Sequence, residues 1–322
     1  MRRALLAFAF LLALPLHAQP ERVVIGVYVT GLYDFNPGEN CYTVSFWVWT
    51  RHHSPQLHPL ETVVVENAKS VTTTKSLQTV KNGEIWTQRF VIAVIRYDWQ
   101  LHAYPFDSHR LPLVLEEGQY DTSQLTYVAD AAETKVDRES TEDGWEVDDF
   151  RFVARDRQYP TTFGDPALTN HTSSRFAQFR ADILVRRTEI GIFIKLLLGA
   201  YVAFFLTMLT FRLKMDQPTF FSMRLSVLVG SLFAVLVNLR ATEAVLGRTA
   251  DFTLVDKIHL AIAFYILIAA IAAFLSRRIA ERKEGLPQSI RFDGIGMWLF
   301  GVTFVLINVI LIVLAVRAGA GR

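Results

Sequence analysis

The sequence is poor in cysteine, in net charge and in catalytic motifs, and each shortage removes a class of protein. Cys41 is the single cysteine among 322 residues, so no intrachain disulfide can form and a disulfide-stabilised scaffold is excluded. The formal net charge is only +2, so no nucleic-acid partner is expected. The sequence contains no nucleophile elbow, zinc-protease HExxH, phosphate loop or dinucleotide fingerprint. We therefore expect no enzyme activity and no cofactor.

Histidine offers the densest group of candidate metal ligands, with His52, His53 and His58 close together. Neighbouring residues of a strand point to opposite faces, so His52 and His53 suit a shared ion poorly. Solvated loop histidines are the simpler interpretation, and we expect no metal site.

The first 18 residues have the pattern of a secretory signal peptide. Arg2 and Arg3 precede the apolar run 4–16, and Ala18 supplies a small residue at its exit. A short membrane anchor is the alternative, but the run is shorter than the roughly 20 residues that a spanning helix needs. We expect residues 1–18 to be removed and the next segment to lie outside the cytoplasmic membrane.

Residues 19–187 alternate between apolar and polar positions in short runs, as half-buried strands do. Turn signals such as Asn36-Pro37-Gly38 and Asn82-Gly83 separate the runs. Many short strands with regular turns predict an all-β sandwich. The expected strands are 23–29, 42–49, 62–65, 86–95, 110–115, 145–153 and 176–185.

From Ile190 onward the sequence is dominated by apolar stretches, each with about the ~20 residues that cross a bilayer. Basic residues gather at Arg212 and Lys214 and again between the third and fourth stretches. By the positive-inside rule these connections are cytoplasmic, which places the β domain and the C-terminus outside. We expect a multi-pass protein of the inner (plasma) membrane, with a helical domain at 188–322 that spans at 190–211, 223–246, 254–275 and 295–316.

The second apolar stretch carries one unusual stripe. Alternating steps of four and three residues trace a line that is small and polar at one end, apolar in the middle and charged at the other. A membrane helix usually turns such a face to water or to a partner. Packing against another helix, without a pore, is the alternative. The line consists of Ser226, Gly230, Phe233, Val237, Arg240 and Ala244.

The segment Tyr104-Pro105-Phe106-Asp107-Ser108 lies between two expected strands. It resembles the F/Y-P-F-D signature of the pentameric ligand-gated ion channels, the Cys-loop receptor superfamily. The family's flanking cysteines are absent, as in its prokaryotic branch. Segments 39–44, 66–68 and 144–150 are also similar to family segments, and the resemblance covers nearly all of the chain after the signal peptide. It implies a homopentamer that conducts inorganic ions and is surrounded by membrane lipids.

The resemblance implies an agonist site between subunits, in a box of aromatic and polar side chains that can hold a cationic amine by cation–π contact. Core packing is the alternative for the loop D tryptophan. Proton gating, through carboxylates and His109, is the alternative to a small-molecule agonist. The matching positions are Trp47 for loop D, Glu66 and Asn67 for loop A, Glu133 for loop B, and Tyr159 and Phe163 for loop C.

The resemblance also implies a coupling path between the two domains. In the family, an arginine before the first membrane helix pairs with the signature Asp, and the matching residues here are Arg187 and Asp107. The alternative is that Arg187 lies at lipid headgroups. Two prolines that are usual in the family are absent. Gly199 lies near the place of the proline in the first span, and Gly247 replaces the proline of the linker after the second span. The expected coupling residues are Glu39, Tyr104, Pro105, Phe106, Asp107, Arg187, Arg248 and Asp256.

By resemblance, Phe233 takes the family's central gate position, where rings of Phe233 and Val237 would close the pore by dewetting. The expected function is therefore a ligand-gated or proton-gated ion channel. A non-conducting, membrane-anchored sensor or binding protein of the same fold is the alternative.

Ion selectivity stays open at this point. The glutamate that cation-selective members carry is replaced by Ser222-Met223. Rings of Arg240 and Arg224 would favour anions if both faced the lumen. Glu243 lies one turn from Arg240 and would offset it, so the preference for anions is weak.

Overall fold

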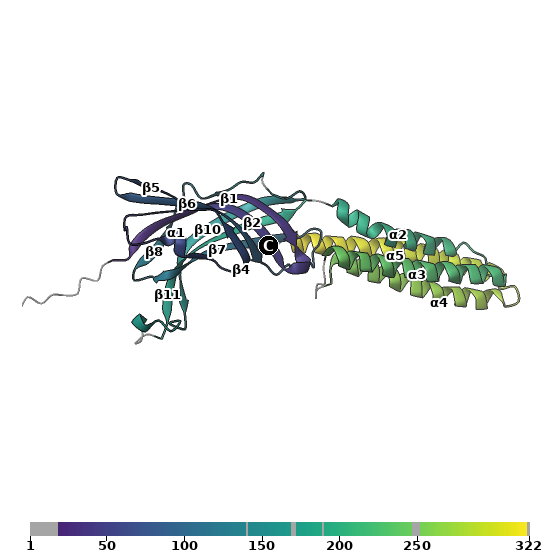
Figure 1. The fold of residues 1–322 in the computed structure, drawn as a ribbon. Coiled ribbons are helices and arrows are strands. Elements are labelled where there is room, and N and C mark those ends of the chain that lie inside the picture. The colour runs from purple at the N-terminus through teal and green to yellow at the C-terminus, as the bar shows by residue number, and fades with distance from the viewer. Residues whose placement is uncertain (1–18, 140, 169–171, 189, 247–251, 321–322) are drawn as a thin grey trace, which may run out of the picture.

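The computed structural model describes residues 19–139, 141–168, 172–188, 190–246 and 252–320. It shows an N-terminal β-rich domain with two sheets, followed by four long apolar helices that run away from it side by side (Figure 1). This order of domains is the one that the sequence predicts. The expected signal peptide, Arg248 and the linker glycine Gly247 lie outside the described residues.

The larger sheet has the strand order β4-β6-β2-β1-β8, with β5 paired to β6 and β9 paired to β1. Gly26 in this sheet is required by a close approach, because a Cβ there would lie 2.3 Å from the ring of Trp49. The indole crosses β1 and donates to Asp130 Oδ2 at 3.1 Å. The strands are β1 (Glu21–Asn36), β2 (Cys41–His52), β4 (Ala68–Thr73), β5 (Leu77–Lys81), β6 (Glu84–Arg96), β8 (Leu125–Ala129) and β9 (Lys135–Val136).

The smaller sheet has the order β10-β11-β7-β3 and is antiparallel. Buried apolar side chains of both sheets, such as Phe46 and Phe179, share one core. Its strands are β3 (Val63–Val65), β7 (Ser108–Asp121), β10 (Trp145–Tyr159) and β11 (Ser174–Arg187), and the short helices of the domain are η1 (Pro37–Glu39), α1 (Pro59–Thr62) and η2 (Pro166–Leu168).

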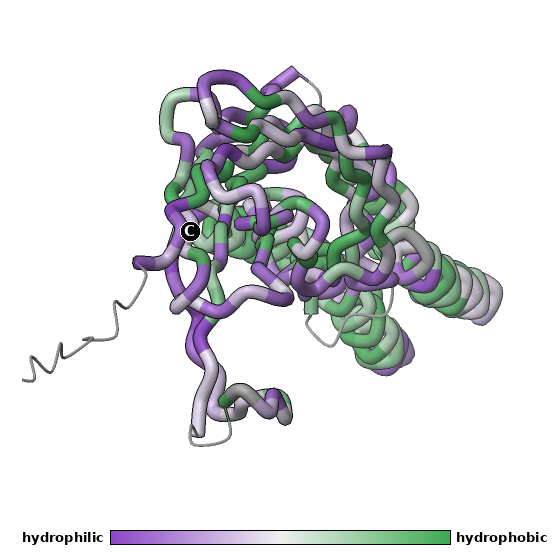
Figure 2. The backbone as a smooth tube through the Cα atoms, turned by 60° about the vertical axis from the view of Figure 1, so that its left-hand side comes forward, coloured by the Kyte–Doolittle hydropathy of each residue, from purple (hydrophilic) through white to green (hydrophobic). Residues whose placement is uncertain are grey.

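The helices are α2 (Gly191–Thr210), α3 (Pro218–Leu246), α4 (Leu254–Ala280) and α5 (Leu286–Ala320), and all four are long and apolar enough to cross a membrane. Figure 2 shows the contrast between these largely hydrophobic helices and the mixed colouring of the β domain. Helix α5 begins at Leu286, well before the predicted span at 295. The additional turns include Asp293, which is buried against α3 and α4.

Candidate functional site

A buried carboxylate lies where the β domain meets the helices. Asp107 follows the Tyr104–Pro105 peptide bond, which is cis, and its side chain is only 2% exposed. Arg187, at the end of β11, donates from Nε to Asp107 Oδ1 at 3.0 Å and from Nη2 to Oδ2 at 3.4 Å. Its backbone N–H donates to the Asp107 carbonyl at 3.2 Å. The predicted pair is therefore present, and its role in coupling stays a prediction.

His109 in β7 gives the same carboxylate a second partner. Its Nε2 lies 2.7 Å from Asp107 Oδ2, and the histidine is as buried as the aspartate. Burial raises the pKa of Asp107, but the hydrogen bond from His109 and the charge of Arg187 outweigh it and lower that pKa to about 2. The carboxylate therefore stays ionised at neutral pH and joins donors from β7 and β11.

Aromatic rings enclose this ionic cluster. The Arg187 guanidinium carbon lies 4.1 Å from the ring centre of Trp145 and 4.8 Å from that of Tyr104. Trp99 packs on His109 with ring centres 4.8 Å apart. The rings keep water away from the ion pair and add cation–π attraction to the arginine, so a lysine would not replace it.

The loop that holds Asp107 also touches two helices. Phe106 packs on Phe193 of α2 with ring centres 6.1 Å apart. Ser108 Oγ donates to the Gly319 carbonyl near the end of α5 at 3.0 Å. A Cβ at Gly319 would lie 1.8 Å from the Phe106 carbonyl oxygen, so only glycine fits there. This contact was not predicted, because a glycine near the end of an apolar helix carries no distinctive signal.

The remaining predicted coupling residues have local roles in the structure. Glu39 is exposed at the end of η1, a segment that contacts α3. Its backbone N–H donates to Asn36 Oδ1 at 3.0 Å, and Lys69 donates to its carbonyl. Asp256 caps the start of α4, where its Oδ2 accepts from the Thr253 N–H at 2.9 Å.

A polar cluster joins two of the predicted agonist residues. Tyr159 donates from its hydroxyl to Glu116 Oε1 at 2.5 Å, and burial together with the Glu116 hydrogen bond raises its pKa to about 12. Gln178 donates to Glu116 Oε2 at 2.8 Å and to Glu66 Oε2 at 3.1 Å. Arg157 completes the cluster through an ion pair with Glu66. The predicted residue Asn67 instead forms a turn, with a φ of 62°.

Phe163 lies beside this cluster and is 64% exposed. Its ring centre is 5.2 Å from that of Tyr159 and 6.1 Å from that of Phe176. The rings of Phe163 and Phe176 border a groove of about 520 Å³ whose lining includes Glu116, Asp121 and Asp165. Aromatic faces next to carboxylates favour a cationic ligand. Glu116 was not among the predicted site residues, because a single carboxylate in a strand carries no distinctive signal.

Trp47 and Glu133 lie elsewhere, over the larger sheet. They border a groove of about 760 Å³ with Tyr28, Trp86 and Arg51. Trp47 is 38% exposed, so the alternative of core packing is wrong for it. Glu133 pairs with Lys135 at 3.6 Å and lies with Trp47 rather than with the loop C residues. The structure thus divides the predicted agonist residues into two sets, one on each sheet.

The predicted stripe lies on the face of α3 that the other helices leave uncovered. Ser226 and Gly230 are exposed, Phe233 is 68% exposed and Val237 is 52% exposed. Arg240 is 80% exposed at its side chain and forms an ion pair with Glu243 at 2.8 Å. No described helix of the same chain therefore covers the stripe, and the alternative of packing against a helix of another copy without a pore stays open. The side chain of Ala244 is outside the described part of the chain.

Arg224 does not share that face, which corrects the expectation that it could line a lumen. It is fully buried and donates from Nη1 to Asp293 Oδ1 on α5 at 2.9 Å. Its guanidinium carbon lies 4.5 Å from the ring centre of Phe211. Asp293 Oδ2 accepts from Ser276 of α4 at 2.6 Å. The pair fastens α3, α4 and α5 together at the end remote from the β domain.

The buried face of α3 carries a second polar contact. Asn238 donates to the Leu196 carbonyl of α2 and to His259 Nε2 of α4, the latter at 2.9 Å. A Cβ at Gly199 would lie 3.1 Å from Asn238 Oδ1, so this glycine permits the close approach of α2 and α3. One face of α3 therefore packs against α2 and α4, and the face that carries the stripe is exposed.

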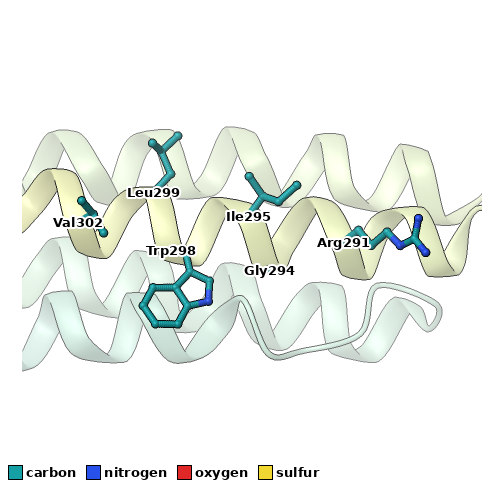
Figure 3. A pocket seen from close by; sticks show the side chains of 6 residues that line it. All are labelled: Arg291, Gly294, Ile295, Trp298, Leu299 and Val302. Atoms are coloured by element: carbon teal, nitrogen blue, oxygen red, sulfur yellow. The ribbon is translucent and has the colours of Figure 1, made fainter.

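The outer face of α5 differs from the exposed face of α3. A shallow, apolar depression of about 620 Å³ runs along it, and Figure 3 shows that every labelled side chain comes from this helix. Trp298 is 73% exposed and Ile295 is 69% exposed, with Arg291 at one end. Such a face suits contact with lipid.

Comparisons of the sequence with protein-family models and with curated proteins find no match. Within the ranges that the structure describes, no group of three or more His, Cys, Asp or Glu side chains could hold a metal ion.

Proposed function

We propose that the chain is one subunit of a homopentameric ligand-gated ion channel, of the pentameric ligand-gated family, in the inner membrane. The uncovered face of α3 carries this proposal. A helix face that met only lipid would have no use for Ser226 and Gly230 at one end and an Arg240–Glu243 ion pair at the other. Copies of α3 around a common axis would instead enclose water, with Phe233 side chains narrowing its middle.

The two sets of predicted agonist residues fit a site shared between neighbouring copies. The loop C set, with Tyr159 and Phe163, would meet the groove that contains Trp47 on the next subunit. Exposed aromatic rings on both surfaces, and carboxylates such as Glu116 in the first, support a cationic amine as the ligand. Protons are the alternative stimulus.

The proposed orientation in the membrane is based on the basic residues in the connections between the helices. Connections at the end of the bundle remote from the β domain carry Arg212, Lys214, Arg282 and Lys283. This end would lie in the cytoplasm, and the β domain would lie outside.

Ion flux from liposomes tests the proposal. Phe233→Ala would remove the gate and raise passive ion leak above that of the wild-type protein. Phe264→Ala is the matched control, because Phe264 of α4 is 63% exposed, close to the 68% of Phe233, but lies off the α3 face. Equal leak from both variants would contradict the gate assignment.

A non-conducting sensor of the same fold is the second candidate, motivated by the absence of two prolines usual in the family, near whose places the sequence has Gly199 and Gly247. Such a protein would bind ligand through the β domain and show no flux in any variant. Flux from Phe233→Ala would eliminate it.

A further inference from the structure

The charges of α3 are few and unevenly placed. Between Pro218 and Leu246 the sequence has only Arg224, Arg240 and Glu243 as charged residues. Arg224 is fully buried and paired with Asp293, so it cannot contact an ion in a lumen. Arg240 and Glu243 are therefore the residues of this helix whose charges could act on a permeating ion. They lie at the end of α3 nearer to the β domain.

The two partners are not equivalent. Arg240 continues the line of Phe233 and Val237, whereas Glu243, three residues later, lies about 60° around the helix from it. The exposure agrees with this geometry, because the Arg240 side chain is 80% exposed and that of Glu243 is 45% exposed. The guanidinium thus projects from the middle of the uncovered face, and the carboxylate holds it from the side.

We propose that Arg240 selects the permeating ion and favours small inorganic anions, and that Glu243 weakens this preference. The inference rests on the proposed channel function and deepens it. Around a shared axis, the guanidinium groups form a positive ring in a part of the pore with low-dielectric walls, which raises the local concentration of anions. Glu243 keeps the net charge of each pair at zero, so the preference depends on which partner lies nearer to the axis.

The test is the reversal potential in asymmetric sodium chloride, measured on full-length protein in liposomes. Phe233→Ala serves as the background, so that conduction needs no identified agonist. Arg240→Gln should lower the chloride-to-sodium permeability ratio about threefold to tenfold, and Glu243→Gln should raise it by a similar factor. Arg282→Gln is the control, because Arg282 is exposed in the connection between α4 and α5.

The possible outcomes distinguish a failure of the proposed role of Arg240 from a failure of the proposed channel function. A persisting current with an unchanged permeability ratio in Arg240→Gln would overturn the role of Arg240 and leave the channel intact. Should that variant fail to assemble, Glu243→Gln decides, and an unchanged or lower ratio there overturns the inference. Absence of current in both the wild type and the background variant would overturn the channel function, and the inference with it.

Discussion

Replacing Asp107 with asparagine removes the charge at the centre of the domain junction and leaves the side-chain shape intact. The pKa of Asp107 lies at about 2 instead of 3.8. That difference corresponds to about 2 kcal/mol of stability at neutral pH. Loss of one partner from a buried ion pair typically costs about 3–5 kcal/mol, because the other charge stays buried and unpaired. The structure therefore predicts a loss of about 2–5 kcal/mol.

The pH dependence has a definite sign. Because the folded pKa of Asp107 is lower than the unfolded value, the contribution is fully present above the unfolded value of 3.8. It is lost as the pH falls toward about 2. Asp107→Asn should lack this part of the acid sensitivity. The difference in stability between variant and wild type should therefore shrink as the pH falls from 3.8 toward about 2.

Thermal unfolding of the full chain in detergent measures the effect. Tryptophan fluorescence is a suitable signal, because Trp99 and Trp145 lie in the cluster. Asp107→Asn should lower the Tm by about 4–20 °C at neutral pH, given about 2–4 °C per kcal/mol for domains of this size. Asp148→Asn is the control, since Asp148 forms an exposed ion pair with Arg186 at 3.1 Å. Exposed pairs contribute about 0–1 kcal/mol.

A double variant tests whether Asp107 and Arg187 stabilise the junction through their mutual contact. Arg187→Gln should also lower the Tm, and the double variant should lose clearly less than the sum of the single losses. Single variants no less stable than Asp148→Asn, or strictly additive losses, would show that the Asp107–Arg187 contact does not hold the junction.

Two further substitutions probe the helices. Gly319→Ala should detach the end of α5 from the β domain, because its Cβ would lie 1.8 Å from the Phe106 carbonyl oxygen, whereas a Cβ at Gly301 meets open space. Limited proteolysis should therefore cut the C-terminus faster in Gly319→Ala than in Gly301→Ala, and equal rates would contradict the contact. Arg224→Met should cost about 3–5 kcal/mol by leaving Asp293 unpaired, and the added change Asp293→Leu should restore most of it. Thermal unfolding checks both, and a double variant no more stable than the single one would contradict the pairing.

The architecture could be predicted because its signals are local. Strand alternation, turn residues and apolar runs each depend on neighbouring residues, and the structure confirms the β domain and four membrane-length helices. The Asp107–Arg187 contact joins residues far apart in the sequence, and it was predicted by resemblance to a motif. His109 on the same carboxylate, and Gly319 against Phe106, have no such motif and could not be found in this way.

Arg224 shows a different kind of error, because the information was present in the sequence. Nine residues separate it from Phe233, and at about 100° per residue they place it on the opposite side of the helix. The position of Arg224 on the opposite side was overlooked, because a charged residue within an apolar membrane helix suggests a pore. What could not be read from the sequence is that Asp293, which lies just before the predicted fourth span, is its partner inside the bundle.

The Asp107 loop is held by contacts to several elements at once, which limits where movement can occur in the proposed channel. Phe106, Asp107 and Ser108 contact α2, β11 and α5 in succession. Arg187 ends β11 and holds Asp107, so a shift of β11 would carry the loop with it. By contrast, η1 contacts α3 without an ion pair or side-chain hydrogen bond among the described residues. In the proposed channel, the contact between η1 and α3 is therefore the one that could slide, and rotation of the β domain would act there on the helix that bears Phe233.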